Sequence, residues 1–136
     1  MGFDKFGIVN HVPETKVADF VTFLEEGEVK GTRCKKCNTY YFPPRMDCSK
    51  CLVSDMEWVG IKGVGKLVTY AEVNYGPTGF EEQAPYTLAV ADFDGIKIFG
   101  FLSRDLKESD IKIGMSVKVT PLKLPNDRIA YELIKA

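Results

Sequence analysis

The fold of this chain is decided by residues 34–51, CKKCNTYYFPPRMDCSKC. This stretch holds two Cys-x-x-Cys pairs with ten residues between them. Zn²⁺ prefers a tetrahedral shell of four sulfur or nitrogen ligands, and two such pairs supply four thiolates. We therefore expect a zinc ribbon in which Cys34, Cys37, Cys48 and Cys51 are the metal ligands. The zinc is expected to be structural, because a filled shell leaves no position for water or substrate.

Each knuckle of such a ribbon often needs a left-handed backbone just after its second cysteine. Asn38 tolerates that conformation, whereas Leu52 at the matching place is less accommodating. Rubredoxin-type iron would use the same ligands, and spacing alone does not separate iron from zinc. Redox dithiols would need a thioredoxin-like setting, and disulfides would need an oxidising compartment.

Composition points to a soluble, cytoplasmic protein with one compact core or a small domain plus an appended module. The chain has 136 residues, of which 45% are apolar, and a formal charge of −1. No apolar run approaches the ~20 residues of a membrane helix, and the N-terminus shows no secretory signal. The charge disfavours unspecific nucleic-acid binding, which needs a basic face.

The N-terminal part reads as an arm followed by a helix. Residues 1–13 are expected either to lie on the domain or to dock onto a partner, and His11, the only histidine, is expected to be exposed and without chemical role. Residues 15–26 carry apolar side chains at helical spacing, and Gly27 ends the pattern. Phe23 lies off the apolar stripe, at the edge of a core or in a subunit interface.

Two short strands, 29–32 and 39–42, are predicted around the first knuckle, and five follow in the second half of the chain. The latter cover residues 64–74, 86–93, 96–102, 115–122 and 128–134, with a tight Asp94-Gly95 turn and a helical turn near 108–114. This order is that of an OB-fold barrel. The predicted fold is mainly β, with an arm and helix (1–28), a four-cysteine zinc ribbon (29–60) and a five-stranded OB-fold domain (61–136).

The order of motifs along nearly the whole chain is specific. It runs through Gly27, Gly31 and Arg33, the two cysteine pairs, FPPR at 42–45, Trp58, Gly63-x-Gly65, Pro85-Tyr86 and Ile113-Gly114-Met115. In this order the chain resembles the acyl-CoA-associated OB-fold proteins with an N-terminal rubredoxin-like zinc ribbon, catalogued as domain of unknown function thirty-five (DUF35). Asn38 stands where that family often has glycine.

The resemblance implies a non-catalytic partner of a thiolase-fold enzyme. Members of the family resemble small subunits of acetoacetyl-CoA thiolase, which acts with HMG-CoA synthase in archaea, or of benzylsuccinyl-CoA thiolase, and some partner hydratases. By this resemblance the chain would form a hetero-oligomer with such an enzyme and help shape its acyl-CoA channel. CoA would then be shared with the partner.

The residue types agree with a non-catalytic role, because every cysteine is assigned to metal and His11 has no evident partner. A CoA channel needs cations at its mouth and aromatic or proline walls. The candidate cations are Arg45, Lys62, Lys66 and Arg104, and the candidate walls are Phe42, Pro44, Phe80 and Tyr86. Arg33, Lys35, Lys36 and Lys50 are expected to offset the charge of the zinc-thiolate cluster.

Two other functions remain open at this point. A single-stranded nucleic-acid module would use Tyr70, Tyr75, Phe99 and Phe101 as stacking platforms. Strand alternation instead assigns most of these aromatics to the barrel core, and a basic groove is missing. An independent acyl-CoA hydrolase or redox protein would need activity of the isolated chain.

Overall fold

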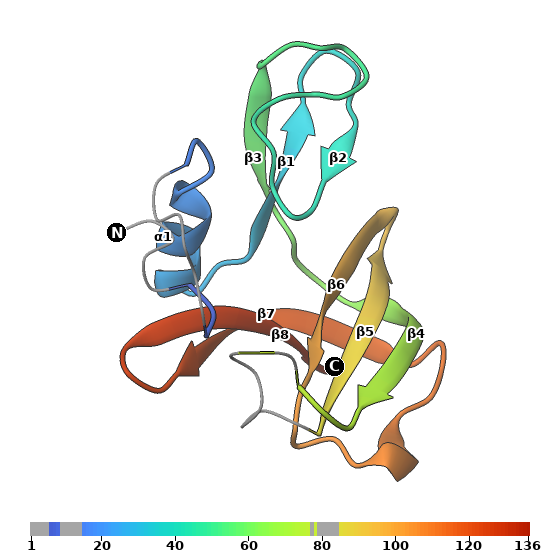
Figure 1. Ribbon diagram of the computed structural model, residues 1–136. Coiled ribbons are helices and arrows are strands. Elements are labelled where there is room, and N and C mark those ends of the chain that lie inside the picture. The colour runs from blue at the N-terminus through green and yellow to red at the C-terminus, as the bar shows by residue number, and fades with distance from the viewer. Residues whose placement is uncertain (1–5, 9–14, 77, 79–84) are drawn as a thin grey trace.

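The protein consists of one helix, a three-stranded ribbon and a closed five-stranded barrel (Figure 1). The computed structural model describes residues 6–8, 15–76, 78 and 85–136. Helix α1 (Asp19–Glu25) is followed by the ribbon strands β1 (Lys30–Cys34), β2 (Tyr40–Tyr41) and β3 (Met56–Gly60). The barrel comprises β4 (Gly65–Val73), β5 (Tyr86–Phe93), β6 (Ile96–Leu102), β7 (Ser116–Leu124) and β8 (Arg128–Lys135), with the short helix η3 (Glu108–Asp110) between β6 and β7. The predicted fold class is confirmed.

Helix α1 is shorter than the predicted 15–26, but it buries the expected stripe. Phe20, Val21 and Leu24 are buried, and the chain leaves the helix at Gly27, whose φ is 90°. The Phe23 ring packs edge-on against Trp58, with ring centroids 5.1 Å apart. Phe23 therefore belongs to the edge of the core. Among the described residues no helix has the length and apolarity needed to cross a membrane.

The ribbon has the strand order β2-β1-β3, and its third strand was not predicted. The central strand carries Thr32, which is fully buried between Tyr41 and Trp58. The Thr32 hydroxyl donates to the Arg45 carbonyl (2.7 Å) and accepts from the Arg45 N–H (2.9 Å). This pair of bonds fixes the FPPR segment to the ribbon.

The barrel closes in the order β4-β5-β6-β8-β7, around a core that includes Leu67, Ile98 and Leu133. Strands β5 and β6 turn at Asp94 and Gly95, whose φ values of 57° and 96° fit the predicted tight hairpin. Strands β7 and β8 reverse through Asn126 and Asp127, which also have positive φ. Both hairpins follow the predictions.

Strand β4 departs from the predicted alternation after Leu67. A bulge interrupts its pairing with β5 between Leu67 and Thr69, and Thr69, Tyr70 and Ala71 are all exposed. Strand pairing with β7 is confined to Gly65 and Lys66. The outer half of β4 therefore lies on a single neighbouring strand among the described residues. Of the predicted inward side chains, Leu67 is buried and Val73 is half-buried, whereas Thr69 and Ala71 are exposed.

A second core joins the helix to the end of the barrel. Phe20, Val29 and Ile129 belong to it, and Phe42 and Tyr131 pack against both this core and the barrel core. Phe6 pairs with Ile129 in a parallel bridge. This part of the N-terminal arm therefore lies on the domain, which was the first of the two expectations for it. His11 lies outside the described residues. Figure 1 shows β7 and β8 extending beneath α1, and the ribbon strands β1, β2 and β3 at the top of the view.

Candidate metal centre

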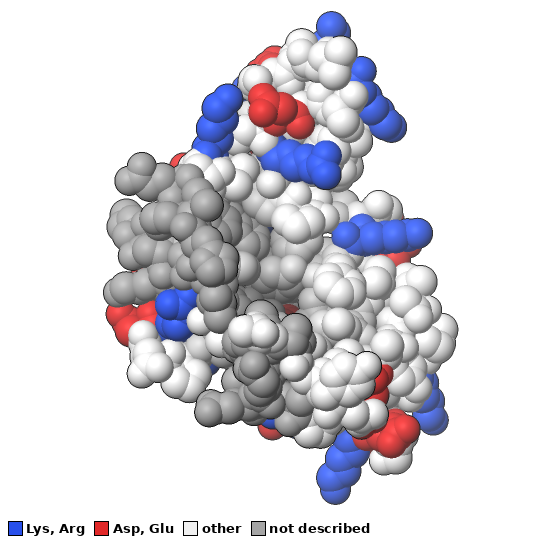
Figure 2. Space-filling model, in the orientation of Figure 1, with Lys and Arg blue, Asp and Glu red and all other residues white. Residues whose placement is uncertain are grey.

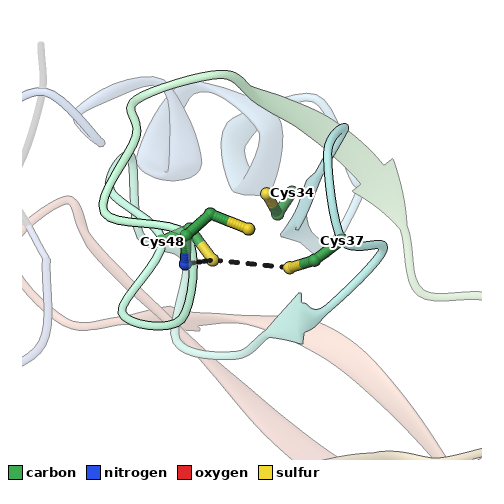
Figure 3. Close-up of side chains that lie close together, drawn as sticks. Cys34, Cys37 and Cys48 are labelled. Atoms are coloured by element: carbon green, nitrogen blue, oxygen red, sulfur yellow. Dashed lines mark hydrogen bonds between the residues drawn. The ribbon is translucent and has the colours of Figure 1, made fainter.

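The four predicted ligands form one cluster. One sulfur from each of Cys34, Cys37, Cys48 and Cys51 lies within 4.8 Å of the other three, and the sulfurs of Cys37 and Cys48 are 3.6 Å apart. A tetrahedral shell with Zn–S bonds of about 2.3 Å places its sulfurs about 3.8 Å apart. The donor set therefore fits a structural zinc ion. Figure 3 shows the sulfurs of Cys34, Cys37 and Cys48 turned toward a common centre.

The two knuckles share one backbone pattern. Asn38 N–H donates to the Cys34 carbonyl (2.8 Å), and Leu52 N–H donates to the Cys48 carbonyl (2.9 Å). Asn38 and Leu52 have φ values of 60° and 57°. The second knuckle thus adopts the same left-handed turn as the first, although leucine is poorly suited to it. The Leu52 side chain is 85% exposed.

Hydroxyl groups support two of the ligand sulfurs. The Tyr41 hydroxyl lies 3.5 Å from the Cys48 sulfur and lowers the pKa of that thiol to about 6. The Thr39 hydroxyl, 3.1 Å from the Cys37 sulfur, lowers the pKa of Cys37. Hydrogen bonding with Cys37 raises the pKa of Cys51 to about 12, because neighbouring sulfurs share protons when no cation balances them. A bound Zn²⁺ supplies the positive charge that keeps such ligands deprotonated.

The cations around the cluster are partly committed to carboxylates. Arg33 forms an ion pair with Glu57 and donates to the Asn38 side chain (3.2 Å), which ties the first knuckle to β3. Hydrogen bonding to Glu57 raises the pKa of Arg33. Lys35 lies 3.7 Å from the Asp55 carboxylate. An offset of the zinc-thiolate charge by these cations stays a prediction.

The candidate CoA residues fall into separate places. Tyr86 and Arg104 line an apolar groove of about 520 Å³ on the barrel. Pro44 and Arg45 line an open hollow of about 440 Å³ where the FPPR segment faces the residues before α1.

The other candidates lie outside both hollows. The Phe42 ring packs at 5.2 Å from Tyr131, between centroids, within the junction of helix and barrel. Lys62 and Lys66 are exposed near Gly63 and Gly65, and Phe80 lies outside the described residues. The described candidates therefore do not form one continuous set.

The apolar groove on the barrel was not predicted from the sequence. Its walls include Leu88, Phe99, Phe101, Leu122 and Leu124. Phe99 is 56% exposed and Tyr75 is 84% exposed, and Tyr70 is exposed as well. The prediction that alternation buries most of these aromatics was wrong. In β6 the inward positions belong to Ile98, Gly100 and Leu102, so the two phenylalanines alternate onto the outer face.

Comparisons with known families cover most of the chain. Residues 22–57 match the family model described as "ChsH2, rubredoxin-like zinc ribbon domain". Residues 58–120 match the model described as "ChsH2, C-terminal OB-fold domain".

Similar curated proteins come from archaea and bacteria. A DUF35 domain-containing scaffold protein of Methanocaldococcus jannaschii is 39% identical over 99 residues, which cover 71% of this chain and 70% of the relative. The benzoylsuccinyl-CoA thiolase subunit BbsA of Geobacter metallireducens is 26% identical over 102 residues, covering 74% of this chain and 68% of the relative.

Solved structures share the fold. A chain described as "Ltp2-ChsH2(DUF35) aldolase" superposes with a TM-score of 0.74 at 21% identity, covering 93% of this chain and 98% of that one. A DUF35 protein of Sulfolobus solfataricus gives a TM-score of 0.57 at 20% identity, covering 85% and 82%. With the four-cysteine cluster, the closed barrel and these matches in place, the chain belongs to the DUF35 family of proteins with a ChsH2-type zinc ribbon and OB-fold.

Proposed function

We propose that this chain is a non-catalytic, zinc-containing accessory subunit of an enzyme that acts on acyl-CoA. One observation carries the proposal: all four cysteines of the chain meet in a single metal-binding cluster. Thiolysis needs a nucleophilic cysteine, an acid–base partner and an oxyanion hole. Because the cysteines are committed to the metal, the nucleophile has to come from another chain.

The relatives support this direction and suggest the kind of partner. Some are named as scaffold proteins and others as subunits of a thiolase, and a structural neighbour is described with an aldolase. We infer a hetero-oligomer with a thiolase-fold enzyme. The relatives that are thiolase subunits are named for benzoylsuccinyl-CoA, which is a ketone. The family resemblance described in the sequence analysis had given the substrate as benzylsuccinyl-CoA. A ketone is the form that carbon–carbon cleavage by a thiol requires.

In this proposal the chain also helps to form the acyl-CoA channel of the complex. Arg45 and Lys16 lie along one open hollow and supply cations for the phosphates of CoA. Tyr86 and Arg104 lie along the apolar groove of the barrel. Lys62 and Lys66, both exposed, are further candidates for phosphate contacts.

A nucleic-acid role is less well supported by the surface. The exposed Phe99 does provide a stacking platform on the face that OB-folds use for ligands. However, the groove beside it has Arg104 as its single cation among the described lining residues, with Asp105 and Glu132 close by. Figure 2 shows basic and acidic side chains interspersed on the visible face, without a basic stripe. Binding of single strands depends on such a stripe.

The test is reconstitution with a thiolase-fold partner. The chain is co-expressed with the candidate enzyme, the complex is isolated, and CoA-dependent cleavage of a 3-ketoacyl-CoA is measured for the enzyme with and without this chain. We expect a stable complex, at least a tenfold higher rate in its presence, and no turnover by the isolated chain. Turnover by the zinc-loaded chain alone, or a cysteine in it that reacts with a thiol reagent without metal loss, would contradict the proposal.

A further inference from the structure

The apolar groove lies on the outside of the barrel, on the face that OB-folds commonly use for ligands. Strands β5 and β6 form one wall, the C-terminal end of β7 and the middle of β8 form the other, and residues 6–8 border it. Its volume of about 520 Å³ is within the roughly 300–1,000 Å³ typical of small-molecule sites. The groove is thus of a size for one organic group rather than for a flat protein contact.

Cross-strand pairing makes the outer wall apolar. Leu88 pairs with Phe101 and Val90 pairs with Phe99, while Ala89 and Ala91 take the inward positions of β5. The outward residues of an antiparallel sheet are commonly polar when they face water. Here they are aliphatic and aromatic, which favours an apolar occupant.

The groove exists because β6 and β8 pair over only two positions. These are Phe101 with Glu132 and Leu102 with Leu133, and Figure 1 shows the two strands diverging from there. The Tyr131 hydroxyl spans the separation by donating to the Phe99 carbonyl (2.7 Å). Gly100 admits the Tyr131 ring, since a Cβ there would lie 2.9 Å from Tyr131 Cε2. The floor of the groove is therefore fixed by this contact.

The charges along the groove argue against a polyanion. Arg104 is the one basic lining residue that the structure describes, whereas Asp105 and Glu132 are acidic. Burial raises the pKa of Glu132, and the nearby Asp105 adds to the effect, as expected for a wall of low polarity. The phosphates of a CoA nucleotide would be repelled here, while a neutral apolar group would lose only its contact with water.

From this geometry we infer that the groove binds the apolar acyl group of a thioester, of aryl or medium-chain size, and does not bind the CoA nucleotide. The inference rests on the proposed function and names the substrate class for it. Edge or face contacts with Phe99 and Phe101 would suit an aryl group, and the leucine walls would suit an alkyl chain.

The experiment uses the zinc-loaded full chain without its partner. Leucine and valine methyl groups are labelled, and NMR spectra are recorded during titration with S-benzoyl-, S-octanoyl- and S-acetyl-pantetheine and with CoA. We expect saturable shifts at Leu88, Leu122 and Leu124 for the benzoyl and octanoyl thioesters, with a Kd at least tenfold lower than for the acetyl thioester. CoA is expected to leave these methyl groups unshifted.

Two variants and one control locate the binding. Leu88→Trp fills the groove and should weaken binding of both the benzoyl and the octanoyl thioester at least tenfold. Phe99→Ala should weaken binding of the benzoyl thioester more than that of the octanoyl one. The control is Ile113→Trp, at a position that is 62% exposed and outside the groove lining, and it should bind as the parent chain does. Zinc content and the dispersion of the methyl spectrum identify any variant that fails to fold.

Three outcomes would overturn the inference. They are the absence of shifts at millimolar thioester, equal binding of the acetyl and benzoyl forms, and shifts that depend only on protein concentration. The third would make the groove a contact between copies of this chain. None of the three changes the reconstitution assay, so failure here is distinguishable from failure of the proposed function.

Discussion

Replacing Leu52 by glycine is expected to stabilise the metal-bound ribbon. Leu52 follows the second cysteine pair with φ at 57°, and its side chain is 85% exposed. An L-residue with a Cβ in this conformation costs about 1–2 kcal/mol, which glycine avoids. Because the side chain is so exposed, its removal sacrifices little apolar burial.

The expected gain is smaller than the strain that is relieved. Glycine loses about 0.5–1 kcal/mol more conformational entropy on folding than a residue with a side chain. The net stabilisation is therefore about 0.5–1 kcal/mol, or a two- to fivefold lower Kd for zinc, since about 1.4 kcal/mol corresponds to tenfold. Asn38→Gly is the matched control at the equivalent place in the first knuckle. Asparagine tolerates φ of 60° and accepts a hydrogen bond from Arg33 (3.2 Å), so that variant should gain nothing.

The assay is competition for zinc with a chelator of known affinity at fixed pH. The single tryptophan, Trp58, lies on β3 against Phe23 and reports ribbon unfolding by its fluorescence. Complete removal of zinc is expected to unfold the ribbon, because structural zinc supplies roughly 10–16 kcal/mol in small domains. The reasoning is refuted if Leu52→Gly releases zinc more readily than the parent chain, or if Asn38→Gly gains as much.

Three further changes test contacts away from the metal. Thr32→Val should cost about 1–3 kcal/mol in denaturant unfolding because it leaves the Arg45 N–H and carbonyl unpaired, whereas Thr32→Ser should cost less; equal losses would contradict this. Gly100→Ala should cost about 1–3 kcal/mol through its clash with Tyr131, and a double-mutant cycle with Tyr131→Ala should show that most of this loss disappears without the ring. Glu132→Gln should stabilise the fold at pH 7, since burial raises the pKa of Glu132 and so makes its charged form unfavourable. That gain should vanish below about pH 4.3, the ordinary glutamate pKa, where the group is protonated in both folded and unfolded states; a gain independent of pH would contradict it.

The metal centre could be predicted because the spacing of its four cysteines along the sequence is typical of a zinc site. Two Cys-x-x-Cys pairs ten residues apart are close enough to converge on one metal, and the structure brings their sulfurs within 4.8 Å. The β5–β6 hairpin was equally accessible, because Asp94-Gly95 has a strong preference for positive φ. In both cases the determining residues are neighbours in the sequence.

The features that were missed depend on contacts between distant segments. Strand β3 has four half-buried residues in a row, so it carries no alternation to read. Both faces of β6 carry apolar side chains, and only the closed barrel decides that Ile98 turns inward while Phe99 turns outward. The bulge after Leu67 likewise follows from pairing with β5. The candidate cations for the CoA phosphates were chosen by residue type alone. They lie in separate places because their positions also depend on contacts between distant segments.

Phe42 shows how the ribbon contributes to the barrel. It follows β2 between the two cysteine pairs, and its ring contacts Tyr131 with centroids 5.2 Å apart. Tyr131 in turn holds the Phe99 carbonyl (2.7 Å) at the floor of the apolar groove. Packing is therefore continuous from the loop between the two cysteine pairs to the groove wall. The division between ribbon and barrel at residues 60 and 61 stays a prediction, and Phe42 packs against both hydrophobic cores. A zinc ion that holds the loop of Phe42 in place would therefore also support the groove.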